Sequence, residues 1–251
     1  MQKLTELGGA AMKRFILNVS IIIGINVGAA SAAPHLTPET YYALKPENYQ
    51  HQLKYVFKDN LRKDVVLSSL VEPSSSREYL VGIRNQDGKD LVFSITPETR
   101  VANIELLKQI ENGKAQKHDS TGNKIPIEND PSYIELKKST PASYKSIKTE
   151  TRELAIPQEI ASRISAAWES ALLGVRRERK PDMFLDGAVY HYSMRVKGFG
   201  LISGQRSTSD DDRHMTALTR LTDALYSYSR KEATINDIIR FLEEYETSVT
   251  K

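Results

Sequence analysis

Apolar residues recur at helical spacing in five segments of the chain. This pattern predicts helices at 46–62, 101–110, 157–177 and 211–230, and a last helix that starts near 235. The clearest is 157–177, where Ile160, Ile164, Trp168 and Leu172 recur every four residues and form one stripe that we expect to be buried. The run from Thr234 to Asp237 resembles a capping box for the last helix, although Asp replaces the usual Glu or Gln.

Short apolar runs around turn residues predict antiparallel hairpins. The runs 79–83 and 91–95 flank a polar turn at 85–89, and we place Tyr79, Val81 and Ile83 on one face with Leu91, Phe93 and Ile95. The runs 189–196 and 199–204 flank Lys197 and Gly198. A two-residue turn there pairs Val196 with Phe199 and Met194 with Leu201. Segments 133–137 and 144–154 are predicted to be two further strands.

The predicted helices and strands come in blocks rather than in strict alternation, which disfavours a parallel doubly wound sheet. We therefore predict an α+β fold in which an antiparallel sheet built from hairpins has helices packed on one face. The polar stretch 111–131 is expected to be a long surface loop. The segment 33–251 is then one domain, or two sub-domains divided within 111–143.

The N-terminal segment has the pattern of a secretory signal peptide. Lys13 and Arg14 precede a mostly apolar stretch, 15–27, and Ala30-Ser31-Ala32 fits the cleavage pattern. A membrane span needs about 20 apolar residues, and this stretch is shorter and contains two asparagines. We predict that residues 1–32 are removed as a signal peptide, with 12–32 as the functional part, from a start at either Met1 or Met12. The mature protein is then periplasmic or secreted, with Ala33 first and no transmembrane span.

Composition narrows the chemistry further. The chain has no cysteine, which excludes disulfides, thiol nucleophiles and zinc held by cysteine. Removing residues 1–32 takes away Lys3, Lys13, Arg14 and Glu6, and leaves 32 basic and 31 acidic residues, a net charge of +1. A nearly neutral chain gives no electrostatic reason to expect nucleic acid or an anionic membrane as a partner.

The candidate site is the polar face of the hairpin at 189–204. Strand alternation sets Tyr190, Tyr192 and Met194 on the core face, and it sets His191, Ser193 and Arg195 on the other face. With the two-residue turn, Arg206 joins His191 on that second face, where glycines expose the backbone. The hypothesis is a shallow groove in which His191, Ser193, Arg195 and Arg206 hold an anionic or peptide-like ligand. The alternative is an ordinary solvated sheet face.

Catalytic signatures are missing from the sequence: it has no nucleophile elbow, no paired-histidine zinc motif and no phosphate-binding loop. The sequence marks no partner for His191, which a general base needs. We therefore expect an exported envelope protein that binds a macromolecular partner or a small ligand without catalysis, and that needs no metal or other cofactor. Its partner is an envelope or extracellular protein or a small ligand. The alternative is an exported hydrolase that uses carboxylates and His191 in a sheet groove.

Overall fold

The computed structural model describes residues 36, 47–58, 62–113, 117–118, 124–127, 130–175, 187–208 and 213–249. All of them belong to one compact unit, Ala32–Lys251. The predicted signal peptide lies outside the described residues.

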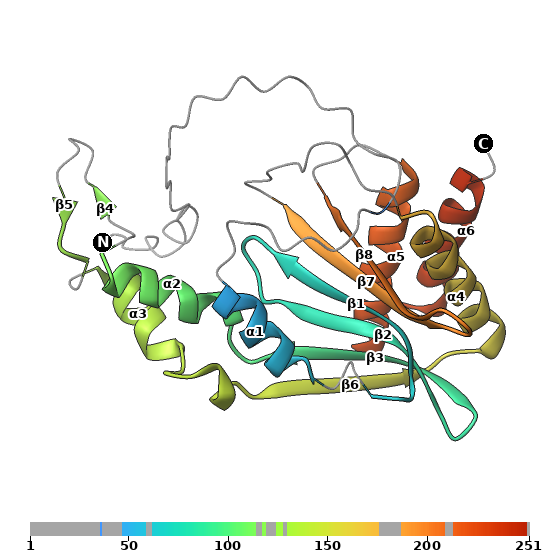
Figure 1. The fold of residues 1–251 in the computed structure, drawn as a ribbon, viewed down its shortest axis with the longest axis horizontal. Coiled ribbons are helices and arrows are strands. Elements are labelled where there is room, and N and C mark those ends of the chain that lie inside the picture. The colour runs from blue at the N-terminus through green and yellow to red at the C-terminus, as the bar shows by residue number, and fades with distance from the viewer. Residues whose placement is uncertain are drawn as a thin grey trace, which may run out of the picture. The chain divides into compact units, whose positions relative to one another are not determined.

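The main helices and strands follow one another in the order shown in Figure 1. They are α1 (Glu47–Val56), β1 (Val65–Pro73), β2 (Tyr79–Gln86), β3 (Lys89–Pro97), α2 (Val101–Glu111), α3 (Pro131–Ser139), β6 (Thr149–Ala155), α4 (Gln158–Leu173), β7 (Ala188–Val196), β8 (Gly200–Ser207), α5 (Arg213–Ser229) and α6 (Ile235–Val249). The short strands β4 (Lys117–His118) and β5 (Lys124–Ile125) pair with each other, and the 3₁₀ turn η3 (Tyr144–Ser146) precedes β6.

The six long strands form one sheet in the order β6-β3-β2-β1-β7-β8, and every neighbouring pair is antiparallel. The predicted α+β class with an antiparallel sheet is therefore confirmed. The neighbouring strands β1 and β7, which lie inside the sheet, are more than a hundred residues apart in sequence. The two edges of the sheet among the described residues are β6 and β8.

One face of the sheet, which we call the helical face, packs against α4, α5 and α6. The predicted α4 stripe is buried there, and Trp168 is 1% exposed. Its indole meets the ring of Tyr192 on β7 edge to face at a centroid distance of 5.5 Å, as expected for an aromatic pair. The capping box at α6 also forms, because the carboxylate of Asp237 accepts from the backbone N–H of Thr234 at 2.9 Å.

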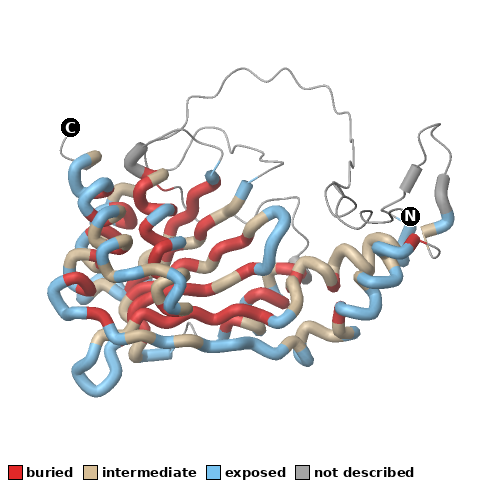
Figure 2. Tube along the Cα trace, turned by 180° about the vertical axis from the view of Figure 1, so that it is seen from behind, coloured by how far each residue is buried: buried red, intermediate tan, exposed pale blue. Residues whose placement is uncertain are grey.

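The opposite face, which we call the α1 face, is also covered in part. This face packs against Tyr49 and Leu53 of helix α1 and against Phe57, which follows the helix directly. These residues share a second apolar cluster with Leu80 on β2 and Phe93 on β3. The central strands are accordingly buried along most of their length, as the red tube in Figure 2 shows.

Strand β1 is the one central strand that the sequence pattern did not predict. Its residues are buried on both faces, so that its sequence shows no alternation of apolar and polar positions. A register shift between Val65 and Leu67 adds an irregularity at its start.

The predicted facing of the first hairpin was wrong. Ile83 pairs with Val92 and Gly82 pairs with Phe93, so Tyr79, Val81 and Ile83 share the helical face with Val92, not with Phe93. Asp87 and Gly88 form a two-residue turn with positive φ angles of 52° and 77°. Because side chains alternate along a strand, a shift of one residue in the pairing exchanges the two faces.

The segment predicted as a strand at 133–137 is helical. Helix α3 starts at Pro131, and the carboxylate of Asp130 accepts from the backbone N–H of Ser132 at 2.8 Å. An Asp cap followed by Pro at the first helical position is a helix start signal, which outweighs the short apolar run. The strand predicted at 144–154 is confirmed only for its second half, since β6 starts at Thr149.

Candidate functional site

The structure brings three of the four predicted site residues to one face of β7. His191, Ser193 and Arg195 all lie on the α1 face, as the period of two predicted. Arg206 does not join them. The β7–β8 connection is a three-residue turn that pairs Val196 with Gly200 and Tyr190 with Arg206. Arg206 therefore lies on the helical face, where it is 4% exposed.

His191 has a carboxylate partner that the sequence did not mark. Its Nε2 lies 2.6 Å from Oε1 of Glu72, and the two side chains are 14% and 3% exposed. Glu72 lies on β1, which pairs with β7. Leu70 is the residue opposite His191, and Glu72 lies two positions further along β1, on the same face. The pair links β1 to β7. Sequence reasoning missed Glu72 because it missed β1.

The neighbouring hydroxyl groups on this face also pair across the two strands. Ser193 lies opposite Ser68, and their Oγ atoms are 2.9 Å apart. Gln205 on β8, opposite His191, is 1% exposed. The polar row on β1, β7 and β8 therefore runs through a buried part of the sheet and contains both a carboxylate and a histidine.

Helix α1 contributes a further polar contact near this row. The hydroxyl of Tyr49 donates to Glu78 at 3.0 Å. Glu78 also accepts from the first backbone N–H groups of α2, at Val101 and Ala102. Burial raises the pKa of Tyr49 well above its usual range, and the negative charges of Glu72 and Glu78 raise it further. This tyrosine is a neutral hydrogen-bond donor that fixes α1 on the sheet.

The helical face holds a second titratable cluster, around Asp223 on α5. The carboxylate accepts from the hydroxyl of Tyr79 at 2.5 Å and from that of Tyr190 at 3.0 Å. Although one side of Asp223 reaches solvent, desolvation raises its pKa, and the two phenolic hydrogen bonds oppose the rise. Burial, followed by the charge of Asp223, raises the pKa of both tyrosines. The cluster fastens α5 to β2 and β7.

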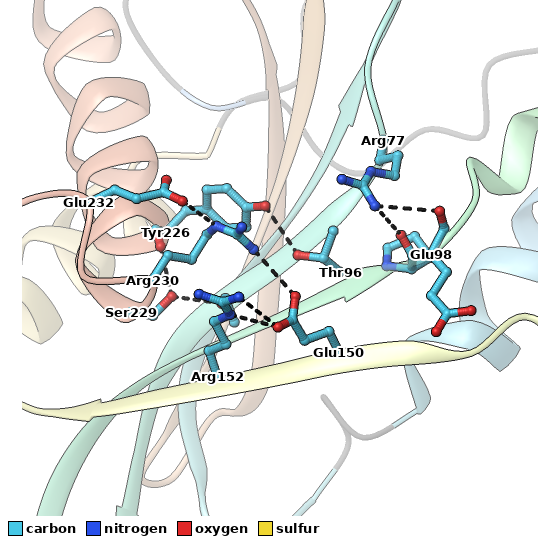
Figure 3. Close-up of polar contacts among 11 residues, drawn as sticks. Arg77, Thr96, Glu98, Glu150, Arg152, Tyr226, Ser229, Arg230 and Glu232 are labelled. Carbon is cyan, nitrogen blue, oxygen red and sulfur yellow. Dashed lines mark hydrogen bonds and ion pairs between the residues drawn. The ribbon is translucent and has the colours of Figure 1, made fainter.

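A charged network fastens the end of α5 to the β6 edge (Figure 3). Arg152 pairs with Glu150 at 2.7 Å, and Arg230 lies between Glu150 at 3.7 Å and Glu232 at 2.9 Å. The Arg152 hydrogen bond is the main reason that the pKa of Glu150 is lowered. Arginines and carboxylates alternate in this network, and no excess charge of one sign is left for a ligand.

The tip of the β7–β8 hairpin has a different character. Phe199 is 74% exposed and Leu201 is 56% exposed. The predicted two-residue turn would have put both on the core face, opposite Val196 and Met194. With the three-residue turn, Phe199 lies within the turn itself and Leu201 pairs with Arg195, so both point away from the core. Gly198 and Gly200 have φ angles of 87° and 82°, which favour glycine.

Within the described ranges, no group of three or more histidine, aspartate and glutamate side chains is arranged to hold a metal ion. In the same part of the chain, no helix combines the length and the apolar character that crossing a bilayer requires. The chain matches no protein family model, no curated protein and no solved structure.

Proposed function

We propose that this chain is an exported protein of the cell envelope that binds a partner without catalysis, and that the tip of the β7–β8 hairpin is its binding surface. The observation that carries the proposal is the exposure of both Phe199 and Leu201, two residues apart at the tip of one hairpin. Apolar side chains that are exposed close together on a protein surface mark interaction sites more often than isolated ones do.

The other large exposed apolar side chains support this choice by contrast. Tyr55, Ile134 and Leu173 are 38%, 39% and 59% exposed, and they lie on three different helices. Isolated apolar residues of this kind are normal on protein surfaces. Among the described residues, only the hairpin tip has two such residues within three positions of the chain.

The test is binding of the purified protein to isolated cell envelopes, measured by sedimentation. The double variant Phe199→Ser/Leu201→Ser is expected to lose binding, because both apolar contacts are removed. Leu173→Ser is the matched control, since it removes an equally exposed leucine from α4. Equal binding by the double variant and the wild type would refute the hairpin as the binding surface.

Export is tested separately. Mass spectrometry of the protein recovered from the envelope or medium is expected to find Ala33 as the first residue. Replacing Ala30 and Ala32 with bulky residues is expected to prevent processing. An unprocessed chain as the main form in wild-type cells would contradict export by a cleaved signal peptide.

One observation favours a second function, the exported hydrolase. The Nε2 of His191 lies 2.6 Å from a buried carboxylate, which is a pairing that general bases use, and Ser193 lies two residues away on the same face. Against this reading, the Oγ of Ser193 contacts Ser68, and Glu72 is almost fully buried. Hydrolysis of activated esters that is lost in Ser193→Ala and in His191→Gln, but kept in Ser203→Ala, would establish the hydrolase and reject the non-catalytic proposal.

A further inference from the structure

We propose that the hairpin tip docks on an anionic lipid surface, with Phe199 and Leu201 entering the interface and with Arg195 and Lys197 at the headgroups. This inference rests on the proposed function, because it names the partner of the same surface. Phosphate-bearing lipid headgroups are the chemistry that the tip would recognise.

The charge of the hairpin supports an anionic partner. The segment 188–207 contains Arg195, Lys197 and Arg206 and has no Asp or Glu. Arg195 and Lys197 are exposed beside the apolar tip, whereas Arg206 is buried on the helical face. Asp64, the acid just before the neighbouring strand β1, is already paired with Arg62 through two hydrogen bonds, at 3.1 and 2.9 Å. The local charge at the tip is thus positive even though the whole chain is close to neutral.

The geometry of the hairpin places apolar and cationic groups next to one another at its tip. Phe199 shares the turn with Lys197, and Leu201 pairs with Arg195 at the end of the two strands. Interfacial protein segments likewise combine apolar side chains, which enter the boundary of the acyl chains, with long basic side chains, which reach the headgroups. A Cβ added at Gly198 or Gly200 would meet no other atom within 4 Å, so there is open space beside both glycines.

The small size of the apolar surface favours a lipid surface over a protein. A stable protein interface buries about 800 Å² on each partner, whereas one aromatic side chain buries about 150–250 Å². Phe199 and Leu201 together supply only part of that area. A bilayer requires no complementary pocket, and a few inserted side chains together with nearby cations give weak, reversible binding. Each cation near an anionic surface contributes roughly fivefold to the affinity.

The direct test uses vesicles and the protein as exporting cells process it. We expect co-sedimentation with phosphatidylcholine vesicles that contain phosphatidylglycerol, and little with phosphatidylcholine alone. Arg195→Gln/Lys197→Gln should weaken binding about 25-fold, if the two contributions add. Phe199→Ser/Leu201→Ser should abolish binding, and Leu173→Ser should leave it unchanged. Added salt should weaken the wild type, because it screens the charges. Circular dichroism of each variant verifies that the fold is intact.

A spectroscopic variant reports insertion itself. In Phe199→Trp the new indole is exposed, and its emission is expected to shift to the blue when vesicles containing phosphatidylglycerol are added. Binding by the folded Phe199→Ser/Leu201→Ser variant equal to that of the wild type, or no blue shift, would overturn docking through the tip. No binding to any vesicle, with envelope binding that still depends on Phe199 and Leu201, would overturn the lipid partner and leave the proposed function standing with a protein partner. Envelope binding that does not depend on the tip would refute both.

Discussion

Replacing Trp168 with alanine is expected to destabilise the fold by about 3–5 kcal/mol, the usual range for a buried Trp or Phe. The indole is 1% exposed at the centre of the contact between α4 and the sheet. It packs edge to face on Tyr192, which is itself fully buried. Truncation removes this aromatic contact and opens a cavity that α4, held along its whole apolar stripe, has little freedom to fill.

Replacing Trp168 with phenylalanine is expected to cost much less, below about 2 kcal/mol. Among the described residues, the indole Nε1 of Trp168 is buried without a hydrogen-bond partner. A buried unsatisfied donor costs roughly 1–3 kcal/mol, and phenylalanine removes that donor while keeping a ring against Tyr192. The relief of this cost offsets part of the lost volume.

Urea unfolding followed by far-ultraviolet circular dichroism measures both variants, since Trp168 is the only tryptophan and its fluorescence is lost with it. Leu173→Ala, at an exposed position on the same helix, is the control and should change stability by less than about 0.5 kcal/mol. A phenylalanine variant as unstable as the alanine variant would mean that the indole N–H has a partner. An alanine variant that loses less than about 1.5 kcal/mol would refute the central position of Trp168 in the core.

Three further predictions concern particular contacts. Glu72→Gln should lower the free energy of unfolding by roughly 1–3 kcal/mol, because His191 loses a buried charged partner. The control in the same urea assay is Glu244→Gln, in the exposed pair with Arg220, which should cost under about 1 kcal/mol. Equal losses of stability in the two variants would contradict a structural role for the His191 pair. The raised pKa of Asp223 means that the folded state holds this proton more tightly than the unfolded chain, so stability should fall as pH rises from about 4 through the folded-state value. Asp223→Asn should remove that part of the pH dependence, so its stability relative to the wild type should increase as the pH rises towards 7. Stability profiles of the two proteins that run parallel across this pH range would show that the carboxylate is not desolvated. Gly82→Ala should cost about 1–3 kcal/mol or more, because the added Cβ would lie 2.2 Å from the carbonyl oxygen of Leu67 on the paired strand; Gly174→Ala, where the nearest atoms are 3.4 Å away, is the control in thermal unfolding.

Part of the candidate site follows from local sequence pattern, and part of it depends on strand pairing between distant segments. That His191 and Ser193 share a face follows from the period of a strand, and their shared face was predicted correctly. Their partners, Glu72 and Ser68, come from β1, which lies more than a hundred residues earlier in the chain. Strand pairing over that distance depends on the packing of the whole sheet, and no spacing in the sequence reports it.

The sequence by itself determined the elements whose signals are local. Helix α4 follows from a stripe that repeats every four residues, α6 from its apolar spacing and capping box, and the hairpins from short apolar runs around turn residues. The tertiary structure decided the rest. A turn of three residues rather than two moved Arg206 into the helical face and turned Phe199 and Leu201 out to solvent, because one step of register exchanges the faces of a strand. The central position of β1 was likewise decided only in the fold, because a strand that is buried on both faces has no polar alternation to reveal it.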